Sequence, residues 1–267
     1  MTGTVVFVGA GPGAADLVTL RGARWLARAD VVLYDALADP GLREFAPHAR
    51  WIHVGKRGYA DSTGQDAINA LMVKHAQAGA VVVRLKGGDP SLFGRLEEEL
   101  SALADAGVPC EVVPGVTAAI AAAAATQRPL TRRGSGRSVS LTTATTAPAL
   151  DAADPASDAP RGADTEVFYM AGKRLGALSR RLQAAGWPSD TPACVVSRAG
   201  WPDMLASEHT AGTLGGASLL HAGRPMVVTV GAGARRIATG APKLAAGAPR
   251  RLVSAAPPPR PRLMSSA

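Results

Sequence analysis

Three short, mainly apolar runs in this sequence pass directly into segments that carry glycine. Residues 5–8 lead into GAGPG at 9–13, residues 81–85 into KGGDP at 86–90, and residues 111–113 into PG at 114–115. A short apolar run that ends at such a turn is typical of a buried parallel strand. Ligands bind at the carboxyl ends of strands in open α/β sheets. The three loops therefore predict one cleft lined by main chain.

The rest of the sequence alternates between strand-like and helix-like patterns, which indicates two α/β domains with a cofactor cleft between them. We place the N-terminal domain at 1–114, the C-terminal domain at 115–235 and a basic, disordered Pro/Ala-rich tail at 236–267. The expected helices are 15–29, 65–78, 92–106, 117–126 and 174–185. The further expected strands are 31–34, 51–54, 139–143, 167–170, 193–196 and 226–230. The Asp-containing stretch 144–166 is expected to be a long surface loop.

The charge of the chain says little about its partners, because the excess is confined to the tail. The formal net charge is +8, but seven of the 29 Lys and Arg residues follow residue 234, where there is no Asp or Glu. The body keeps 22 basic and 21 acidic residues. We therefore expect no nucleic-acid partner. No apolar run approaches the roughly 20 residues of a membrane span, so no membrane partner is expected either.

Cysteine usage and the N-terminus point to the cytoplasm. Cys110 and Cys194 are isolated and have no neighbouring ligand pattern, which favours a reduced compartment and no metal. The first residues lack the basic segment and long apolar stretch of a signal peptide.

The first glycine loop also allows a different function. Gly9, Gly11 and Ala14 satisfy the GxGxxG/A pattern of dinucleotide-binding folds, and Asp35 follows at a suitable distance. An NAD- or FAD-dependent oxidoreductase is therefore an alternative. Pro12 argues against it, because proline offers no N–H group to a pyrophosphate. A tight turn without a ligand is the simplest alternative.

Seven segments together carry a resemblance to a known family. They are VGAGPG at 8–13, LYD at 33–35, VGKR at 54–57, VRLKGGDP at 83–90, VVPGVTA at 112–118, PLT at 129–131 and FYM at 168–170. The chain resembles the tetrapyrrole methylases, and among them the enzymes that methylate uroporphyrinogen III. The resemblance implies the family's two-domain fold, S-adenosylmethionine as cofactor and a homodimer. It also implies two C-methylations that give precorrin-2, for siroheme or cobalamin biosynthesis.

The resemblance assigns roles to individual positions. It implies that Asp35 is the proton acceptor and Lys56 the proton donor. The tetrapyrrole carries several carboxylates, which bind to arginine, and Arg84, Arg57 and Arg132 are the candidates. The cofactor site is implied to contain Pro12, Gly87, Gly88, Asp89, Leu92, Thr117, Ala118, Met170 and Ala199.

The sequence departs from the family pattern on the substrate side. Leu96 and Glu97 replace two glycines of the family's FGRGGEE segment, and Arg132 replaces the histidine of PLTHR. The cofactor loops are intact. A homologue with an altered tetrapyrrole substrate, or without catalysis, therefore stays an alternative.

Overall fold

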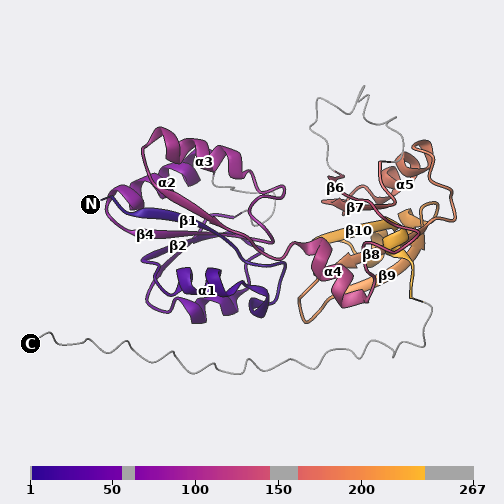
Figure 1. Ribbon diagram of the computed structural model, residues 1–267, viewed down its shortest axis with the longest axis horizontal. Helices are drawn as coiled ribbons and strands as arrows, with labels where there is room; N and C mark the ends of the chain where they lie inside the picture. Colours follow the sequence, from indigo (N-terminus) through magenta and orange to yellow (C-terminus); the bar gives the residue numbers. More distant parts are fainter. Residues whose placement is uncertain (1, 56–63, 145–161, 238–267) are drawn as a thin grey trace, which may run out of the picture.

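The computed structural model describes residues 2–55, 64–144 and 162–237. The predicted fold class is confirmed: two five-stranded sheets with their helices form two α/β units that meet end to end (Figure 1). Lys56 and Arg57, most of the 144–166 loop and nearly all of the tail lie outside the described residues. Every helix in the described residues is too short or too polar to cross a bilayer.

The N-terminal sheet is fully parallel, with the strand order β3-β2-β4-β1-β5. Its strands are β1 (Thr4–Gly9), β2 (Val31–Tyr34), β3 (Arg50–His53), β4 (Val81–Lys86) and β5 (Cys110–Val113). Strands β1 and β4 are neighbours at the centre and are almost wholly buried. This arrangement brings the carboxyl ends of β4, β1 and β5, where the three glycine loops begin, next to one another.

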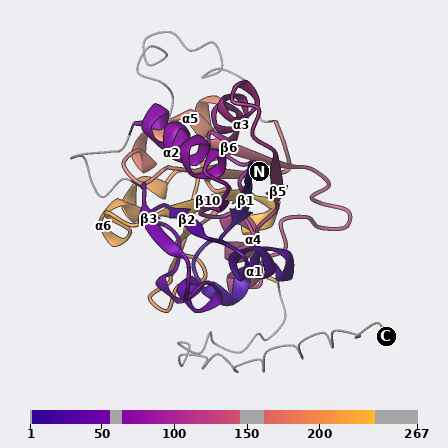
Figure 2. The same ribbon diagram turned by 90° about the vertical axis from the view of Figure 1, so that its left-hand side faces the viewer.

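Helices cover both faces of this sheet (Figures 1 and 2). They are α1 (Leu20–Leu26) on one face and α2 (Gln65–Gln77) and α3 (Leu96–Asp105) on the other, with the short 3-10 helices η1 (Ala15–Leu17) and η2 (Pro40–Phe45). Alternate residues of β1 enter the two cores. Val6 and Val8 pack with Leu26 of α1, and Val5 and Phe7 pack in the cluster that contains Met72 of α2.

Two of the predicted helices are wrong in extent, and backbone geometry explains both. The single helix expected at 15–29 is interrupted because Val18 and Thr19 are extended, and the Thr19 side chain caps α1 by accepting a hydrogen bond from Gly22 N at 3.1 Å. The helix expected from residue 92 begins only at Leu96. Phe93 and Arg95 before it have φ angles of 54° and 55°, which no α-helix accommodates.

The C-terminal sheet is mixed, with the order β6-β7-β10-β8-β9. Only β6 and β7 pair in parallel, and the remaining neighbours are antiparallel. Its elements are α4 (Ala118–Thr126), β6 (Val139–Thr143), β7 (Thr165–Tyr169), α5 (Leu175–Ala184), β8 (Pro192–Ser197), β9 (Leu205–Thr210), η5 (Leu214–Gly216), α6 (Ala217–Leu220), β10 (Met226–Gly231) and η6 (Ala232–Ala234). The edge strand β9 was not predicted, because its sequence is polar and no residue of it is fully buried.

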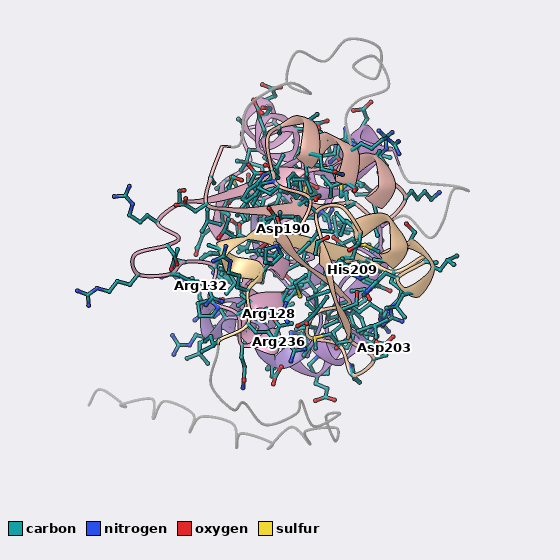
Figure 3. All side chains as sticks on the ribbon, turned by 90° about the vertical axis from the view of Figure 1, so that its right-hand side faces the viewer. Arg128, Arg132, Asp190, Asp203, His209 and Arg236 are labelled. Atoms are coloured by element: carbon teal, nitrogen blue, oxygen red, sulfur yellow. The ribbon has the colours of Figure 1, made fainter. Side chains whose placement is uncertain are left out.

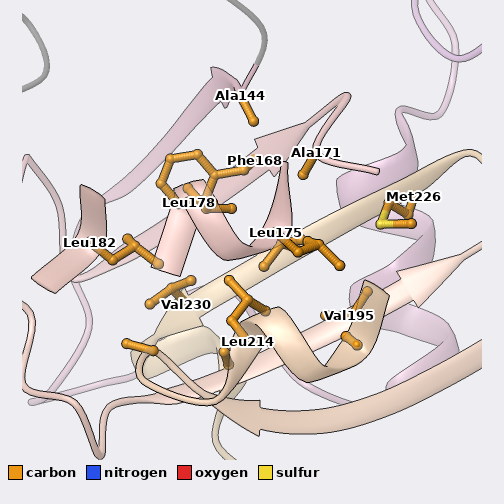
Figure 4. Packing of buried hydrophobic residues seen from close by; sticks show 14 of the residues in the cluster. Ala144, Phe168, Ala171, Leu175, Leu178, Leu182, Val195, Leu214, Met226 and Val230 are labelled. Atoms are coloured by element: carbon orange, nitrogen blue, oxygen red, sulfur yellow. The ribbon is translucent and has the colours of Figure 1, made fainter. Parts of the chain in front are cut away.

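Helix α5 covers one face of this sheet with its apolar side. Leu175, Leu178 and Leu182 pack against Phe168 of β7 and Val230 of β10 (Figure 4). The spacing of these leucines, at positions i, i+3 and i+7, places them on one face of the helix.

A network of buried histidine hydrogen bonds joins the end of β8, the strand β9 and the residue that follows α6. The His221 side chain is fully buried. Its Nδ1 shares a hydrogen bond of 2.9 Å with Ser197 Oγ, and its Nε2 shares one of 2.8 Å with Ser207 Oγ. Ser207 Oγ also lies 2.7 Å from Nε2 of His209. Burial lowers the pKa of His221, and the neighbouring charges of His209 and Arg224 lower it further.

This network predicts a loss of stability in acid. A histidine whose folded-state pKa lies below its unfolded value stays neutral in the native protein and takes up a proton on unfolding. The stabilisation is complete above the unfolded pKa of about 6.5 and is lost as the pH falls below it. We expect the free energy of unfolding to fall from pH 7 to pH 5, by up to about 1.4 kcal/mol per pH unit from His221. Urea denaturation of the His221→Gln variant should show a shallower pH dependence, and an unchanged slope would contradict this prediction.

Candidate active site

The three glycine loops pack against one another at the carboxyl edge of the N-terminal sheet. A Cβ atom added to Gly9 would lie 2.5 Å from Cα of Gly115 and 2.8 Å from O of Gly88. One added to Gly115 would lie 2.3 Å from O of Gly88. Real Cβ atoms do not approach backbone this closely, so these positions require glycine. The loops therefore form a single body of main chain.

Hydrogen bonds hold the first two loops together. Gly88 N donates to Gly11 O at 2.7 Å, and Gly11 N donates to Gly88 O at 3.3 Å. Both residues have positive φ, 76° at Gly11 and 72° at Gly88. On its Cβ side Gly88 is open, with Cα of Thr117 the nearest atom at 3.9 Å. Main chain at this point is accessible to a ligand.

Two carboxylates fasten these loops. Asp35, after β2, accepts hydrogen bonds from Leu37 N at 2.9 Å and from Gly87 N at 3.1 Å. Asp89 accepts from Ser91 N and from Gly115 N, both at 2.8 Å. Asp35 thus links the ends of β2 and β4, and Asp89 links the second loop to the third.

The C-terminal domain contributes the opposite side of this region through the end of β7. The Tyr169 hydroxyl lies 2.6 Å from Thr117 Oγ1 and accepts a hydrogen bond from Ala119 N at 3.3 Å. Its ring lies 5.1 Å from the ring of Phe93 in the N-terminal domain. The next residue, Met170, has φ of 56° and is half exposed. Non-glycine residues in this region of φ are strained, and such strain concentrates at functional sites.

A second contact between the domains involves the segment after β8. Ala199 is buried, and a Cβ atom on Gly13 would lie 2.8 Å from its carbonyl oxygen. The predicted cofactor residues of the two domains therefore lie on either side of one junction. Phe93, Tyr169 and Trp201 belong to it too but were not predicted. Phe93 and Tyr169 lie within the FGRLEEE and FYM segments, whereas no motif contains Trp201.

Arg84 occupies a different place from the one expected of a substrate ligand. Its side chain is 5% exposed and donates to Glu99 Oε1 at 2.9 Å and to the carbonyl of Leu85 at 3.1 Å. Glu99 of α3 is fully buried and also pairs with Lys86. Burial, and next to it the Arg84 charge, lowers the pKa of Lys86. Arg84 is thus committed to an internal ion-pair cluster beneath the loops.

Arg132 also lies away from the junction. It donates to the carbonyls of Ala232, at 2.7 Å, and Arg235. These follow the end of β10 that pairs with Thr165, opposite to the end that pairs with Tyr169. Figure 3 shows Arg132 on the side turned away from the N-terminal domain, near Arg128 and Arg236. The sequence-based assignment of Arg84 and Arg132 to substrate carboxylates is not supported by their placement.

Among the described residues, Arg95 is better placed than Arg84 or Arg132 to bind a substrate carboxylate. It follows Phe93 by two positions and its side chain is about half exposed, with Nε and a terminal nitrogen each 2.6 Å from Glu98. Its positive φ holds it at the start of α3, beside the second glycine loop.

Comparison with known proteins identifies the family. The model of the tetrapyrrole (corrin/porphyrin) methylases matches residues 4–215. The chain belongs to the tetrapyrrole methylase family. The match covers the N-terminal domain and the C-terminal domain as far as residue 215, including all three glycine loops and β7.

The relatives of this methylase include enzymes of named activity. It is 42% identical to a uroporphyrinogen-III C-methyltransferase of Pseudomonas aeruginosa over 90% of this chain and 97% of the relative. It is 48% identical to siroheme synthase 2 of Yersinia pestis, over 73% of this chain but only 42% of that protein. The solved uroporphyrin-III C-methyltransferase of Thermus thermophilus in complex with S-adenosylhomocysteine is 34% identical, with a TM-score of 0.73 over 86% of this chain and 97% of that chain.

These matches also bear on the alternative of a nicotinamide or flavin enzyme. The GxGxxG-like pattern of the first loop belongs here to a methylase. In the structure Gly9 packs on Gly88 and Gly115, and Gly11 forms its bridge with Gly88. These glycines are explained by contacts between loops, so the pattern carries no argument for a dinucleotide.

Proposed function

We propose that this methylase transfers methyl groups from S-adenosylmethionine to two carbons of uroporphyrinogen III and so forms precorrin-2. The observation that carries the proposal is the convergence of three glycine loops on the junction with β7. The relatives named above support the substrate and the cofactor. The product would serve siroheme or cobalamin biosynthesis.

The residues at the junction fit the cofactor. Accessible main chain at Gly88 lies beside Thr117, at the start of α4. We propose that the first backbone N–H groups of this helix bind the carboxylate of the cofactor's amino-acid part. We assign Pro12, Gly87, Gly88, Asp89, Leu92, Thr117, Ala118, Met170 and Ala199 to this site. Asp89 contributes by holding the second loop to the third, through the hydrogen bonds that it accepts from Ser91 N and Gly115 N. The sulfonium supplies an activated methyl group, so the protein has mainly to align it with the acceptor carbon and exclude water.

Asp35 is assigned as the proton acceptor and Lys56 as the donor. Asp35 stands at the carboxyl end of β2, and its Oδ2 is 3.1 Å from N of Gly87 in the second loop. A carboxylate held by two backbone amides has a fixed direction, as a general base requires. Lys56 follows β3, the neighbour of β2 in the sheet.

For the substrate carboxylates we propose Arg57 and Arg95. Arg57 comes four residues after β3 in the sequence, and Arg95 lies between the second glycine loop and α3, with a side chain that is about half exposed. Bidentate guanidinium groups suit the several carboxylates of the tetrapyrrole.

The function is tested by incubating the purified protein with methyl-labelled S-adenosylmethionine and uroporphyrinogen III under anaerobic conditions. We expect two labelled methyl groups in the tetrapyrrole and the absorption spectrum of a dipyrrocorphin-type product. Cofactor binding without transfer to uroporphyrinogen III would instead favour the altered-substrate or non-catalytic homologue.

We expect Asp35→Asn to reduce kcat by about a hundredfold or more, because the amide cannot accept the proton from the methylated macrocycle. Turnover in the labelled assay measures the effect. Asp39→Asn is the matched control, since Asp39 accepts a backbone hydrogen bond from Gly41 in a similar local turn. Equal activity of the two variants would remove Asp35 from the catalytic assignment.

The proposal also covers the oligomeric state of the protein, its location in the cell and its domain boundaries. We propose a homodimer in the cytoplasm, on the resemblance to the family and on cysteine usage. The exposed Leu219 and Leu220 on α6 offer an apolar surface for such an assembly. We place the domain boundary at 114/115, where the chain passes from β5 to α4, with 236–267 outside both domains. Light scattering of the purified chain measures the oligomeric state.

A further inference from the structure

The segment at 198–204, between β8 and β9, reaches from the C-terminal domain onto the first glycine loop. Trp201 Nε1 donates to the carbonyl of Pro12 at 3.1 Å. A Cβ atom on Gly13 would lie 2.4 Å from Cδ1 of Trp201, so the indole rests directly on this glycine. Gly200 approaches the same loop, since a Cβ atom there would lie 3.3 Å from Ala14 N. We call residues 198–204 the latch.

The Trp201 ring is supported from within the latch. The Arg198 guanidinium lies 4.3 Å from the ring centroid, which is a cation–π distance. Arg198 Nε is paired with Asp203 Oδ1 at 2.7 Å, and Asp203 also pairs with Arg224 at 3.3 Å. Trp201 N donates to Arg198 O at 3.0 Å, which closes the turn. These contacts within the latch fix the orientation of the indole.

The latch is anchored in the core of the C-terminal domain. Arg224 Nε donates to Ser197 Oγ at 2.9 Å. Ser197 is fully buried and bonded to the fully buried His221. Arg198 N donates to Pro225 O at 2.8 Å. A chain of contacts therefore runs from this core through Asp203 and Arg198 to Trp201.

The far end of this chain is the cofactor site. Pro12 is adjacent to Gly11, and Gly11 is joined to Gly88 by two hydrogen bonds. A displacement of Pro12 is therefore passed to Gly88, whose main chain faces the proposed cofactor. Proline has a fixed φ and no N–H, so its carbonyl is the backbone hydrogen-bonding group through which the loop can be held at this residue.

We infer that Trp201 is a positioning residue, through which the latch fixes the glycine loops for S-adenosylmethionine. This inference rests on the proposed function, because it takes the glycine loops to be the cofactor site. Trp201 acts through Pro12, and no contact between Trp201 and the cofactor is part of the inference.

The test is calorimetric titration of the full chain with S-adenosylhomocysteine. Trp201→Ala should weaken binding about tenfold, or about 1.4 kcal/mol. Trp201→Phe keeps the ring against Gly13 but loses the hydrogen bond, so it should weaken binding by a smaller factor. Asp203→Ala leaves Trp201 in place but removes the support of Arg198, and it should shift the affinity in the same direction. Trp25→Phe is the control. Trp25 lies on α1, and its Nε1 donates to Glu111 within the N-terminal domain, so this variant also loses an indole hydrogen bond but leaves the latch unchanged.

Steady-state kinetics separate positioning from a general structural role. We expect the KM for S-adenosylmethionine to rise in Trp201→Ala while the KM for uroporphyrinogen III and the urea midpoint stay near the wild-type values. Unchanged affinity in Trp201→Ala, or an equal rise in both KM values with a lower urea midpoint, would overturn the inference. Failure of the wild-type chain itself to bind S-adenosylhomocysteine would overturn the proposed function, and the latch with it.

Discussion

Glu99→Gln should destabilise this methylase by about 3–5 kcal/mol, the usual effect of removing one partner from a buried charge cluster. Glu99 is fully buried and is the partner of both Arg84 and Lys86, which are 5% and 4% exposed. The neutral amide would leave two buried cations beside each other without the anion that compensates them. The free energy of unfolding should fall by about 2–3 kcal/mol per M of urea, so we expect the urea midpoint to be lower by about 1–2.5 M.

Two further proteins serve as controls for the Glu99→Gln experiment. Glu97→Gln lies on the same helix but is exposed, so it should keep the wild-type midpoint. The triple replacement Arg84→Met, Lys86→Met and Glu99→Leu removes the cluster altogether and should recover most of the lost stability. A Glu99→Gln protein as stable as the wild type would show that water or another group satisfies Arg84 and Lys86.

Gly115→Ala should abolish measurable cofactor binding with a smaller effect on stability. The new methyl group would lie 2.3 Å from the carbonyl oxygen of Gly88 and 2.7 Å from Cα of Gly9. Both are backbone atoms of strand-anchored loops, so the loops must separate to admit it. We expect an affinity for S-adenosylhomocysteine at least about a hundredfold lower. The accompanying loss of stability should be about 1–3 kcal/mol.

The control for this prediction is Gly216→Ala. Gly216 has φ of −64° and nothing within 4 Å of an added Cβ atom, so alanine fits without movement. Calorimetric titration should give the wild-type affinity for it. Wild-type affinity in Gly115→Ala as well would mean that the contact of the three loops is not needed for binding.

The three glycine loops and their meeting at one edge of the sheet could be predicted from the sequence, because the patterns that mark them are local. A buried strand, a glycine turn and the next element lie within about ten residues, as in the segment from Val83 to Pro90. The architecture followed, since parallel strands must bring such turns to one edge. The polar edge strand β9 escaped prediction, because its residues pair with β8 and are not marked by an apolar run.

The sequence by itself determined the two α/β domains, the glycine loops and, through its motifs, the family. Tertiary structure alone decided the partners of the charged and aromatic side chains. Arg84 lies beside the glycine loop in sequence but points to Glu99, fifteen residues away, and Trp201 meets Pro12 across 189 residues. A strand or turn is set by neighbouring residues, whereas the partner of a long side chain depends on how whole elements pack, and no local pattern records that.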